Sequence, residues 1–246
     1  ANPKIEQFWL SYIDALIKEQ QFDNAKQVLA QAKAQGVDEA RLNSFEAQGL
    51  PKTEKPNTAT TSPPQELLNS LLWHYQNGRF SDAEKLSIEI TQDFPKHQLA
   101  WKVLGAVLGA TGKKSGAVDA NQTAVTLSPQ DAAAHNNLGI TFQELGKLDE
   151  AESSYRQAIA LKPDFAGSHY NLGVTLKALG KLNDAEASCR KAIVLKADYA
   201  EAHNALGITY QELGKLDEAE SSYRQAIALK PDYAEAHYNL GIMLQE

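Results

Sequence analysis

The sequence repeats itself with a period of 34 residues, and this feature limits the fold more than any other. Residues 132–165 and 200–233 differ at only four positions, and residues 166–199 between them are a looser copy in the same register. A period of this length, kept without insertions, is that of one helix–turn–helix unit in a stacked array. The sequence therefore predicts an all-α fold, an α-solenoid in which each helix pair is stabilised by its neighbours.

Glycine and proline mark the boundaries within each unit. A glycine recurs where the first helix ends, because the left-handed conformation needed there suits glycine best. These glycines are Gly78, Gly112, Gly146, Gly180 and Gly214. Proline, or Ala197 in one unit, follows the second helix, which proline stops because it lacks an N–H. Further glycines lie inside first helices, where they cost helix stability, so we expect close helix contact at them. These are Gly139, Gly173, Gly207 and Gly241.

The repeat frame divides the chain into three parts. Residues 1–48 are predicted to hold a divergent hairpin of the same kind and a short third helix. Residues 49–63 are rich in proline and threonine and are predicted to form a linker. Residues 64–246 are predicted to form the array. Its units are 64–97, 98–131, 132–165, 166–199 and 200–233, followed by the half unit 234–246.

Composition argues against several classes of function. No run approaches the ~20 apolar residues of a transmembrane helix, so we expect neither a membrane span nor a membrane partner. The net charge of −7 disfavours binding to nucleic acid. The first residues lack the pattern of a secretory signal, which favours a cytoplasmic protein. Cys189 is the only cysteine, which excludes an internal disulfide and a cysteine zinc site.

Four histidines recur at the 34-residue spacing, and such a row of histidines suggests metal binding as one hypothesis. They are His135, His169, His203 and His237. Because adjacent helices pack 8–10 Å apart, neighbouring histidines should be roughly 10 Å apart, whereas zinc ligands lie ~2 Å from the metal. We therefore interpret them as packing residues, in the place where an earlier unit has Trp101. Cys189 replaces a tyrosine of other units and is interpreted as buried rather than nucleophilic. No catalytic residue, metal or cofactor is predicted, and we do not expect an enzyme.

The repeated positions resemble the tetratricopeptide repeat (TPR) family. In unit 132–165 the matching residues are His135, Leu138, Gly139, Phe142, Ala151, Tyr155, Ala158 and Pro163. The resemblance is strong over residues 98–246 and weaker over 64–97. It implies a right-handed superhelix whose first helices line a concave groove that binds extended peptides or partner helices. The amino-acid sequence of the units looks most like that of the arrays preceding the catalytic domain of protein O-GlcNAc transferases, although residues 1–246 contain no such catalytic portion.

Asparagines recur at one position that the resemblance places in this groove. In the O-GlcNAc transferase arrays such a ladder holds the peptide backbone, since a primary amide both donates and accepts hydrogen bonds. The candidate ladder here is Asn137, Asn171 and Asn239, interrupted by Ala205. The other predicted groove residues are Asn136, Tyr170, Lys177, Asn204 and Tyr238, with Gln143 and Gln211 nearby and Ile140, Val174 and Ile208 as an apolar floor. The alternative is that the asparagines only cap or bridge adjacent helices.

Two functions remain open at this point. The favoured one is a non-catalytic scaffold that binds a protein or an extended peptide, as the recognition region of a larger bacterial protein. Lysines and arginines are scarce at the groove positions, so a basic clamp for a terminal carboxylate is not expected. The alternative is a scaffold that assembles into homo-oligomers. In that case the edge formed by Leu240, Met243 and Leu244 pairs with the N-terminal hairpin, which contains Trp9.

Overall fold

The computed structural model describes residues 3–18, 25, 28–29, 31–33, 37, 42 and 62–245. The chain divides into two compact units, residues 1–61 and residues 62–246, each with its own hydrophobic core. Within the described ranges every regular element is an α-helix, as the sequence predicts. None of these helices is both long enough and apolar enough to cross a bilayer.

The first unit contains α1 (Pro3–Lys18) and a small apolar core. Ile13 of α1 is buried together with Ala25 and Ala32, two positions that the sequence assigns to the second helix of the hairpin. Trp9 packs against this core and is half-buried. Most of that second helix, of the short third helix and of the predicted linker lies outside the described residues.

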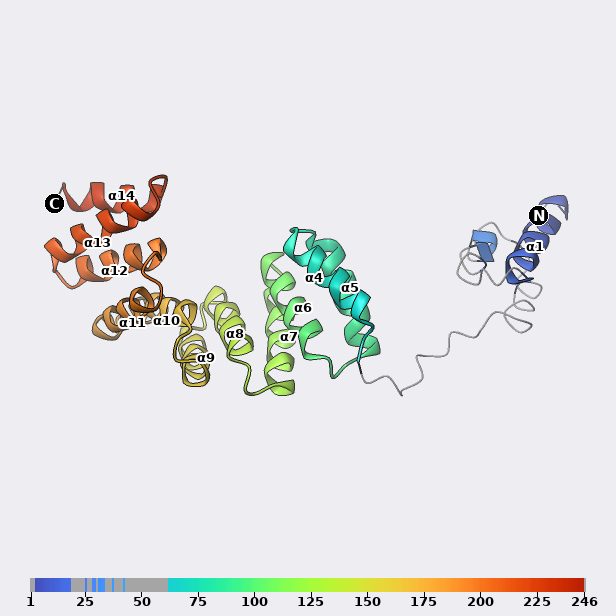
Figure 1. The fold of residues 1–246 in the computed structure, drawn as a ribbon, viewed down its shortest axis with the longest axis horizontal. Helices are drawn as coiled ribbons and strands as arrows, with labels where there is room; N and C mark the ends of the chain where they lie inside the picture. Colours follow the sequence, from blue (N-terminus) through green and yellow to red (C-terminus); the bar gives the residue numbers. More distant parts are fainter. Residues whose placement is uncertain are drawn as a thin grey trace. The chain divides into compact units, whose positions relative to one another are not determined.

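The second unit is the array of helix pairs (Figure 1). Its first helices are α4 (Gln65–Gln76), α6 (Gln98–Ala110), α8 (Ala132–Glu144), α10 (Ala166–Ala178), α12 (Ala200–Glu212) and α14 (Ala234–Met243). Its second helices are α5 (Phe80–Asp93), α7 (Lys114–Leu127), α9 (Leu148–Leu161), α11 (Leu182–Leu195) and α13 (Leu216–Leu229). The helices follow the predicted frame from α4 to α14 without a break.

The glycine after each first helix from α4 to α12 adopts the left-handed conformation that the sequence predicts. The five φ angles lie between 68° and 77°. In unit 132–165 the N–H of Gly146 donates to the carbonyl of Gln143, and the N–H of Lys147 donates to the carbonyl of Phe142, both at 2.9 Å. This pair of bonds is a Schellman motif, which satisfies the last carbonyls of α8 and reverses the chain into α9.

The glycines inside the first helices lie where the two helices of a unit touch. A Cβ at Gly139 or Gly207 would be 2.6 Å from the ring of Tyr155 or Tyr223, and one at Gly173 would be 2.5 Å from Sγ of Cys189. The predicted close contact is thus confirmed at these three positions. Gly241 on α14 differs, because a Cβ there would meet no atom within 4 Å. The close contact requires a second helix after the first, and α14 is the last described helix.

The array bends toward its first helices. From α4 to α14 each first helix has Cα atoms within 8 Å of the first helix of the next unit, whereas no two second helices in this range come that close. A row of touching helices is shorter than a row held apart, so the first helices form the inner side of the curve. The residues predicted for the groove and for the candidate ladder all belong to these first helices.

Candidate binding groove

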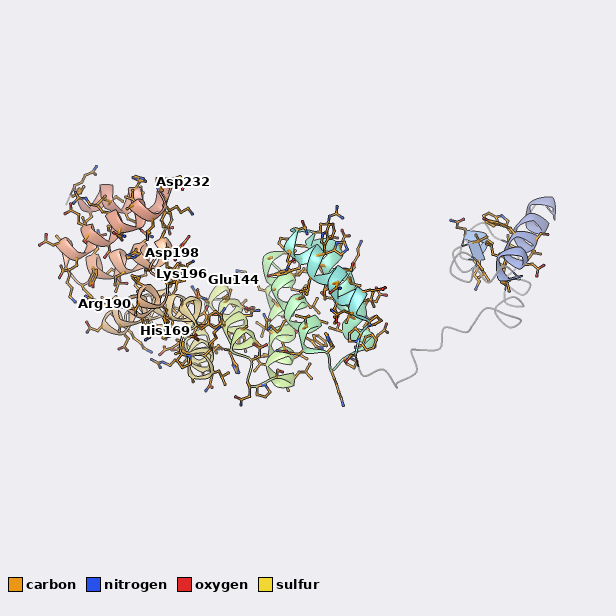
Figure 2. All side chains as sticks on the ribbon, in the orientation of Figure 1. Glu144, His169, Arg190, Lys196, Asp198 and Asp232 are labelled. Carbon is orange, nitrogen blue, oxygen red and sulfur yellow. The ribbon has the colours of Figure 1, made fainter. Side chains whose placement is uncertain are left out.

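A cavity of about 340 Å³ opens between two neighbouring first helices, α8 and α10. Its lining residues are Ile140, Gln143, Glu144, Tyr170, Asn171 and Val174. Five of these were assigned to the groove or its surroundings from the sequence, and the structure brings them together. Glu144 was missed, and Figure 2 shows it at the C-terminal end of α8. The signal that could have found it is the alternation of alanine and glutamate at this position over the four units from 98–131 to 200–233.

Two asparagines of the candidate ladder bind the preceding unit. Nδ2 of Asn171 donates to Oδ1 of Asn136 at 3.2 Å, and Nδ2 of Asn239 donates to Oδ1 of Asn204 at 3.1 Å. The amide oxygens of Asn171 and Asn239 accept no hydrogen bond from the described part of the chain. Asn137 differs from both, since its side-chain amide makes no hydrogen bond to any described residue. Each of the three amides thus keeps hydrogen-bonding groups without a partner among the described residues.

Asn136 and Asn204 do not lie on the groove surface, contrary to the sequence-based expectation. They are only 7% and 2% exposed. Asn136 also accepts a hydrogen bond from Ser168 at 2.9 Å, and Asn204 donates to Glu235 at 3.3 Å. Their side chains are turned into the seam between units, where a buried amide has to be satisfied by partners on the next helix. They support the ladder and do not line it.

The other predicted groove residues have different environments. Tyr238 on α14 is 67% exposed, whereas Tyr170 is half-buried and packs against Tyr199 with ring centroids 5.1 Å apart. Burial, with smaller contributions from neighbouring tyrosines and glutamates, raises the pKa of Tyr170 to about 12. Its hydroxyl therefore stays protonated at neutral pH and can donate a hydrogen bond. Lys177 reaches the next first helix, with Nζ 3.5 Å from Oε1 of Glu212.

Two buried tyrosines donate hydrogen bonds to glutamine side chains of the predicted groove. The hydroxyl of Tyr155 donates to Oε1 of Gln143 at 2.8 Å, and that of Tyr223 donates to Oε1 of Gln211 at 3.0 Å. Gln143 also accepts a bond from Thr175 at 3.2 Å. The amide N–H groups of Gln143 have no partner among the described residues. The core thus fixes the orientation of a groove amide.

The four periodic histidines bind the turn that precedes their own helix. Nε2 of His135 lies 3.0 Å from the carbonyl oxygen of Pro129, and the other three make the equivalent contact at 2.9 to 3.4 Å. Trp101 makes the same contact through Nε1 to the carbonyl of Pro95 at 2.8 Å. The histidines therefore share the role of the tryptophan. No described group of three or more His, Cys, Asp or Glu side chains is placed to hold a metal ion.

Cys189 is buried beneath Gly173 in the slot that holds tyrosine in the units before and after. Burial raises the pKa of its thiol to about 12, so the thiolate needed for nucleophilic chemistry is not formed near neutral pH. This agrees with its interpretation as a packing residue.

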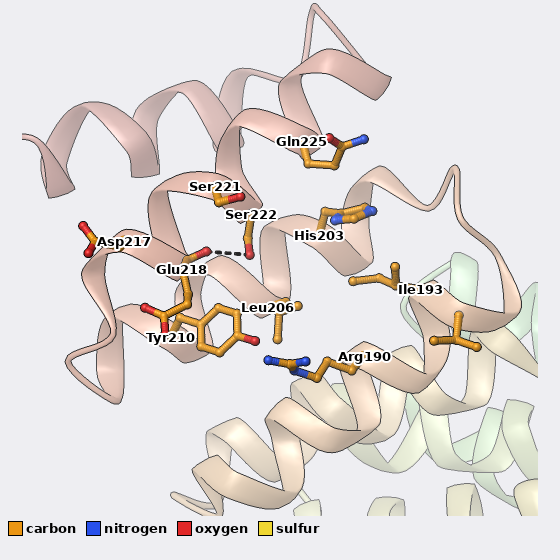
Figure 3. A pocket seen from close by; sticks show the side chains of 11 residues that line it. Arg190, Ile193, His203, Leu206, Tyr210, Asp217, Glu218, Ser221, Ser222 and Gln225 are labelled. Atoms are coloured by element: carbon orange, nitrogen blue, oxygen red, sulfur yellow. Dashed lines mark hydrogen bonds between the residues drawn. The ribbon is translucent and has the colours of Figure 1, made fainter.

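A second opening lies on the outer side of the array and was not anticipated from the sequence (Figure 3). It has a volume of about 660 Å³ and lies between α11 and α13, with α12 beneath it. Val194, which is 76% exposed, and Ile193 supply apolar surface. Figure 3 shows the guanidinium of Arg190 near Tyr210, and the separation to the ring centroid is 5.6 Å. Second helices of successive units lie farther apart than first helices do, which leaves room for this opening.

Helix pairs that pack on one another in series define the class of α-solenoid repeat proteins. The sequence matches the family description "TPR repeat" over residues 141–180, 175–214 and 209–246, and "Tetratricopeptide repeat" over residues 74–132. Together these matches cover more than half of the chain. The chain belongs to the tetratricopeptide repeat family. No curated protein matches the sequence.

Solved structures with the same fold include three TPR proteins of low sequence identity. TTC0263 of Thermus thermophilus is 24% identical, covers 74% of this chain and 99% of its own, and has a TM-score of 0.60. MamA is 23% identical, with 66% and 95% covered and a TM-score of 0.59. YrrB, described as a TPR protein with an unusual peptide-binding site, is 17% identical, with 70% and 89% covered and a TM-score of 0.58. At this identity the likeness concerns the fold.

Proposed function

We propose that the array is a non-catalytic scaffold that binds a segment of extended polypeptide along its first helices. The observation that carries the proposal is the cavity between α8 and α10, where the amide of Asn171 lies beside the apolar side chains of Ile140 and Val174. An amide that is already held in place loses little conformational entropy when a guest binds to it. The groove thus offers backbone hydrogen bonding and apolar contact at the same point.

The hydrogen-bonding capacity of this cavity suits a peptide unit. The Asn171 side chain keeps an acceptor oxygen and one N–H after its bond to Asn136. The Gln143 side chain keeps its N–H groups, because its oxygen is used by Tyr155 and Thr175. Such a pairing satisfies the N–H and C=O of a guest backbone without selecting its side chains. A peptide-binding site is also the feature reported for YrrB.

The test is the affinity of the whole protein for an array of short random-sequence peptides. Asn171→Ala removes the bond to Asn136 and the groove amide, so we expect affinity to fall about two- to tenfold, the value of one net hydrogen bond. Asn183→Ala is the matched control, because Asn183 is exposed on the second helix α11. Equal affinity of Asn171→Ala and the parent protein would show that the ladder does not hold the guest.

Self-association through α14 is a second candidate function. The observation that favours it is the exposed apolar surface of Tyr238, Ile242 and Leu244, together with the open space beside Gly241. Met243 was expected in this edge, but it is 7% exposed and belongs to the core cluster that contains Tyr210 and Tyr223. Leu240 is half-buried against the same cluster.

Light scattering tests this second candidate. The proposal expects the mass of the full chain to rise with concentration, and expects Leu244→Glu to abolish that rise because it places a charge in the apolar contact. The N-terminal hairpin with Trp9 is the proposed cover of this edge in a second copy. A monomeric mass of the parent protein at all concentrations would exclude self-association.

A further inference from the structure

The residues at the groove positions are similar in successive units, but the match is closer between units that are two apart. Five of the six side chains that line the cavity recur two units later. Ile140, Gln143, Glu144, Tyr170 and Asn171 are matched by Ile208, Gln211, Glu212, Tyr238 and Asn239. The unit between them differs, with Lys177 and Ala178 in the places of the glutamine and the glutamate.

Equivalent hydrogen bonds hold the two copies in place. Tyr155 binds Gln143 at 2.8 Å, and two units later Tyr223 binds Gln211 at 3.0 Å. The ladder bonds from Asn171 and Asn239 are 3.2 Å and 3.1 Å long. Glu144 and Glu212 directly follow these glutamines, and each ends its helix. The two carboxylates therefore occupy equivalent places in the groove.

At the second copy the protein supplies its own cation. Lys177, on the first helix of the preceding unit, places Nζ 3.5 Å from Oε1 of Glu212. Both side chains are partly exposed, at 29% and 44%. This ion pair shows that an ammonium group fits beside the carboxylate, between the ends of two neighbouring first helices.

At the first copy the corresponding cation is missing. The residue of α6 that is equivalent to Lys177 is Gly109, and the one atom within 4 Å of a Cβ added there is Oε2 of Glu144, at 3.9 Å. Glu144 is exposed, and its carboxylate makes no ion pair within the described residues. The nearby Lys114 binds the main-chain oxygen of Glu144 instead, at 2.7 Å. Among the described residues the Glu144 carboxylate thus lacks the ion pair that its equivalent, Glu212, makes with Lys177.

We infer that the groove prefers guest segments containing a lysine or arginine, and that this side chain takes beside Glu144 the place that Lys177 takes beside Glu212. The inference rests on the proposed function and adds the chemical class of the guest. Ile140 lies one turn before Glu144 and is 38% exposed, so it offers apolar surface to the aliphatic stem of a basic side chain. The net charge of −7 favours the approach of such a guest.

The experiment compares two fluorescein-labelled peptides by anisotropy with the full-length protein. One peptide has a central arginine, and the other has citrulline, which has the same shape without the charge. We expect the arginine peptide to bind about fivefold more tightly, with a preference that weakens as salt is added. Glu144→Gln should remove the preference, whereas Glu150→Gln, which removes the same charge from the second helix α9, should keep it.

A second variant places an internal cation beside Glu144. Gly109→Lys reproduces the Lys177–Glu212 pair, and we expect it to reduce affinity for the arginine peptide about fivefold while binding of the citrulline peptide stays the same. This variant should remain folded, because a Cβ at position 109 meets no close contact and lysine is a better helix former than glycine. Gln122→Lys adds the same charge on the second helix α7 and should leave the preference intact.

The outcomes separate the inference from the proposed function. Equal binding of both peptides, with both weakened by Asn171→Ala, overturns the charge preference and leaves peptide binding in the groove standing. An equal loss of affinity for the two peptides in Gly109→Lys also overturns the charge preference, since the bulk of the lysine and not its charge would then be responsible. Failure of both peptides to bind overturns the inference and the proposed function together.

Discussion

The side chain of Tyr155 contacts both Gly139 and Gln143, and so links the core of its unit to the groove. A Cβ added at Gly139 would be 2.6 Å from the ring of Tyr155. The hydroxyl of Tyr155 donates to Oε1 of Gln143 at 2.8 Å. Burial, with a smaller contribution from Glu144, raises the pKa of this hydroxyl well above its ordinary value, so it donates throughout the physiological range. Tyr223 repeats both contacts two units later.

Tyr155→Phe should keep the packing under Gly139 and lose only the hydrogen bond. Oε1 of Gln143 still accepts from Thr175 at 3.2 Å, so no buried acceptor is left without a partner. We expect a loss of about 1 kcal/mol in stability, the net value of one hydrogen bond. Chemical denaturation followed by circular dichroism measures it. A loss as large as that of Tyr155→Ala would mean that the hydroxyl, and not the ring, carries the contact.

Gly173→Ala should destabilise the array, whereas Gly241→Ala should not. A Cβ at Gly173 would be 2.5 Å from Sγ of Cys189 and 3.3 Å from main-chain atoms of α11, so neighbouring atoms have to move, at a cost of ~1–3 kcal/mol. At Gly241 a Cβ meets nothing, and alanine is the better helix former by about 1 kcal/mol. The midpoints of thermal unfolding of the two variants should therefore shift in opposite directions from that of the parent protein. Equal shifts would contradict the proposed contact between the two helices of each unit.

Asn121→Leu should stabilise the protein. Asn121 occupies the tyrosine slot of unit 98–131, where its Nδ2 donates to Thr141 at 3.0 Å, but its buried Oδ1 has no partner. A buried acceptor without a partner costs about 1–3 kcal/mol, and leucine has nearly the same shape without it. Asn204→Leu is the control, because both ends of that buried amide are hydrogen-bonded. It should be destabilising, and a stabilising result there would contradict the structural role assigned to Asn204.

Asp131 should make the stability of the array depend measurably on pH in the acid range. Burial alone raises the pKa of this carboxyl, but hydrogen bonds from Lys102 and Gln98 outweigh it and lower the pKa from 3.8 to about 2. A lowered pKa in the folded state means that the stabilisation is complete above the ordinary pKa and is lost as pH falls toward 2. Denaturation midpoints measured from pH 5 to pH 2 should fall less steeply in Asp131→Asn than in the parent protein. Identical slopes would exclude Asp131 as a source of the acid dependence.

The repeat frame could be predicted from the sequence because each marker residue has a local cause. A left-handed turn selects glycine, and a close helix contact excludes any side chain, so both leave a visible 34-residue pattern. The same reasoning fails at Gly241, where the pattern continues but no described second helix follows. A repeated residue type thus predicts a contact only where both contacting elements are present.

The groove could be predicted only in part. Asn136 and Asn137 are adjacent in the sequence, so their side chains point about 100° apart around the helix, and the sequence does not say which of them faces the next unit. The structure buries Asn136 in the seam and leaves Asn137 half-exposed. Met243 was likewise placed on an exposed edge, although it packs on the core of the preceding unit. Such assignments depend on how successive units are rotated, which the sequence does not state.

The central claim is that a guest polypeptide lies along the first helices and not in the outer opening between α11 and α13. Site-specific photo-crosslinking tests it with a photoreactive amino acid at Ile140 in one variant and at Val194 in another, two exposed aliphatic positions on opposite sides of the array. We predict that the arginine peptide becomes linked to the protein through position 140 and not through position 194. Crosslinking through position 194 alone would contradict the claim.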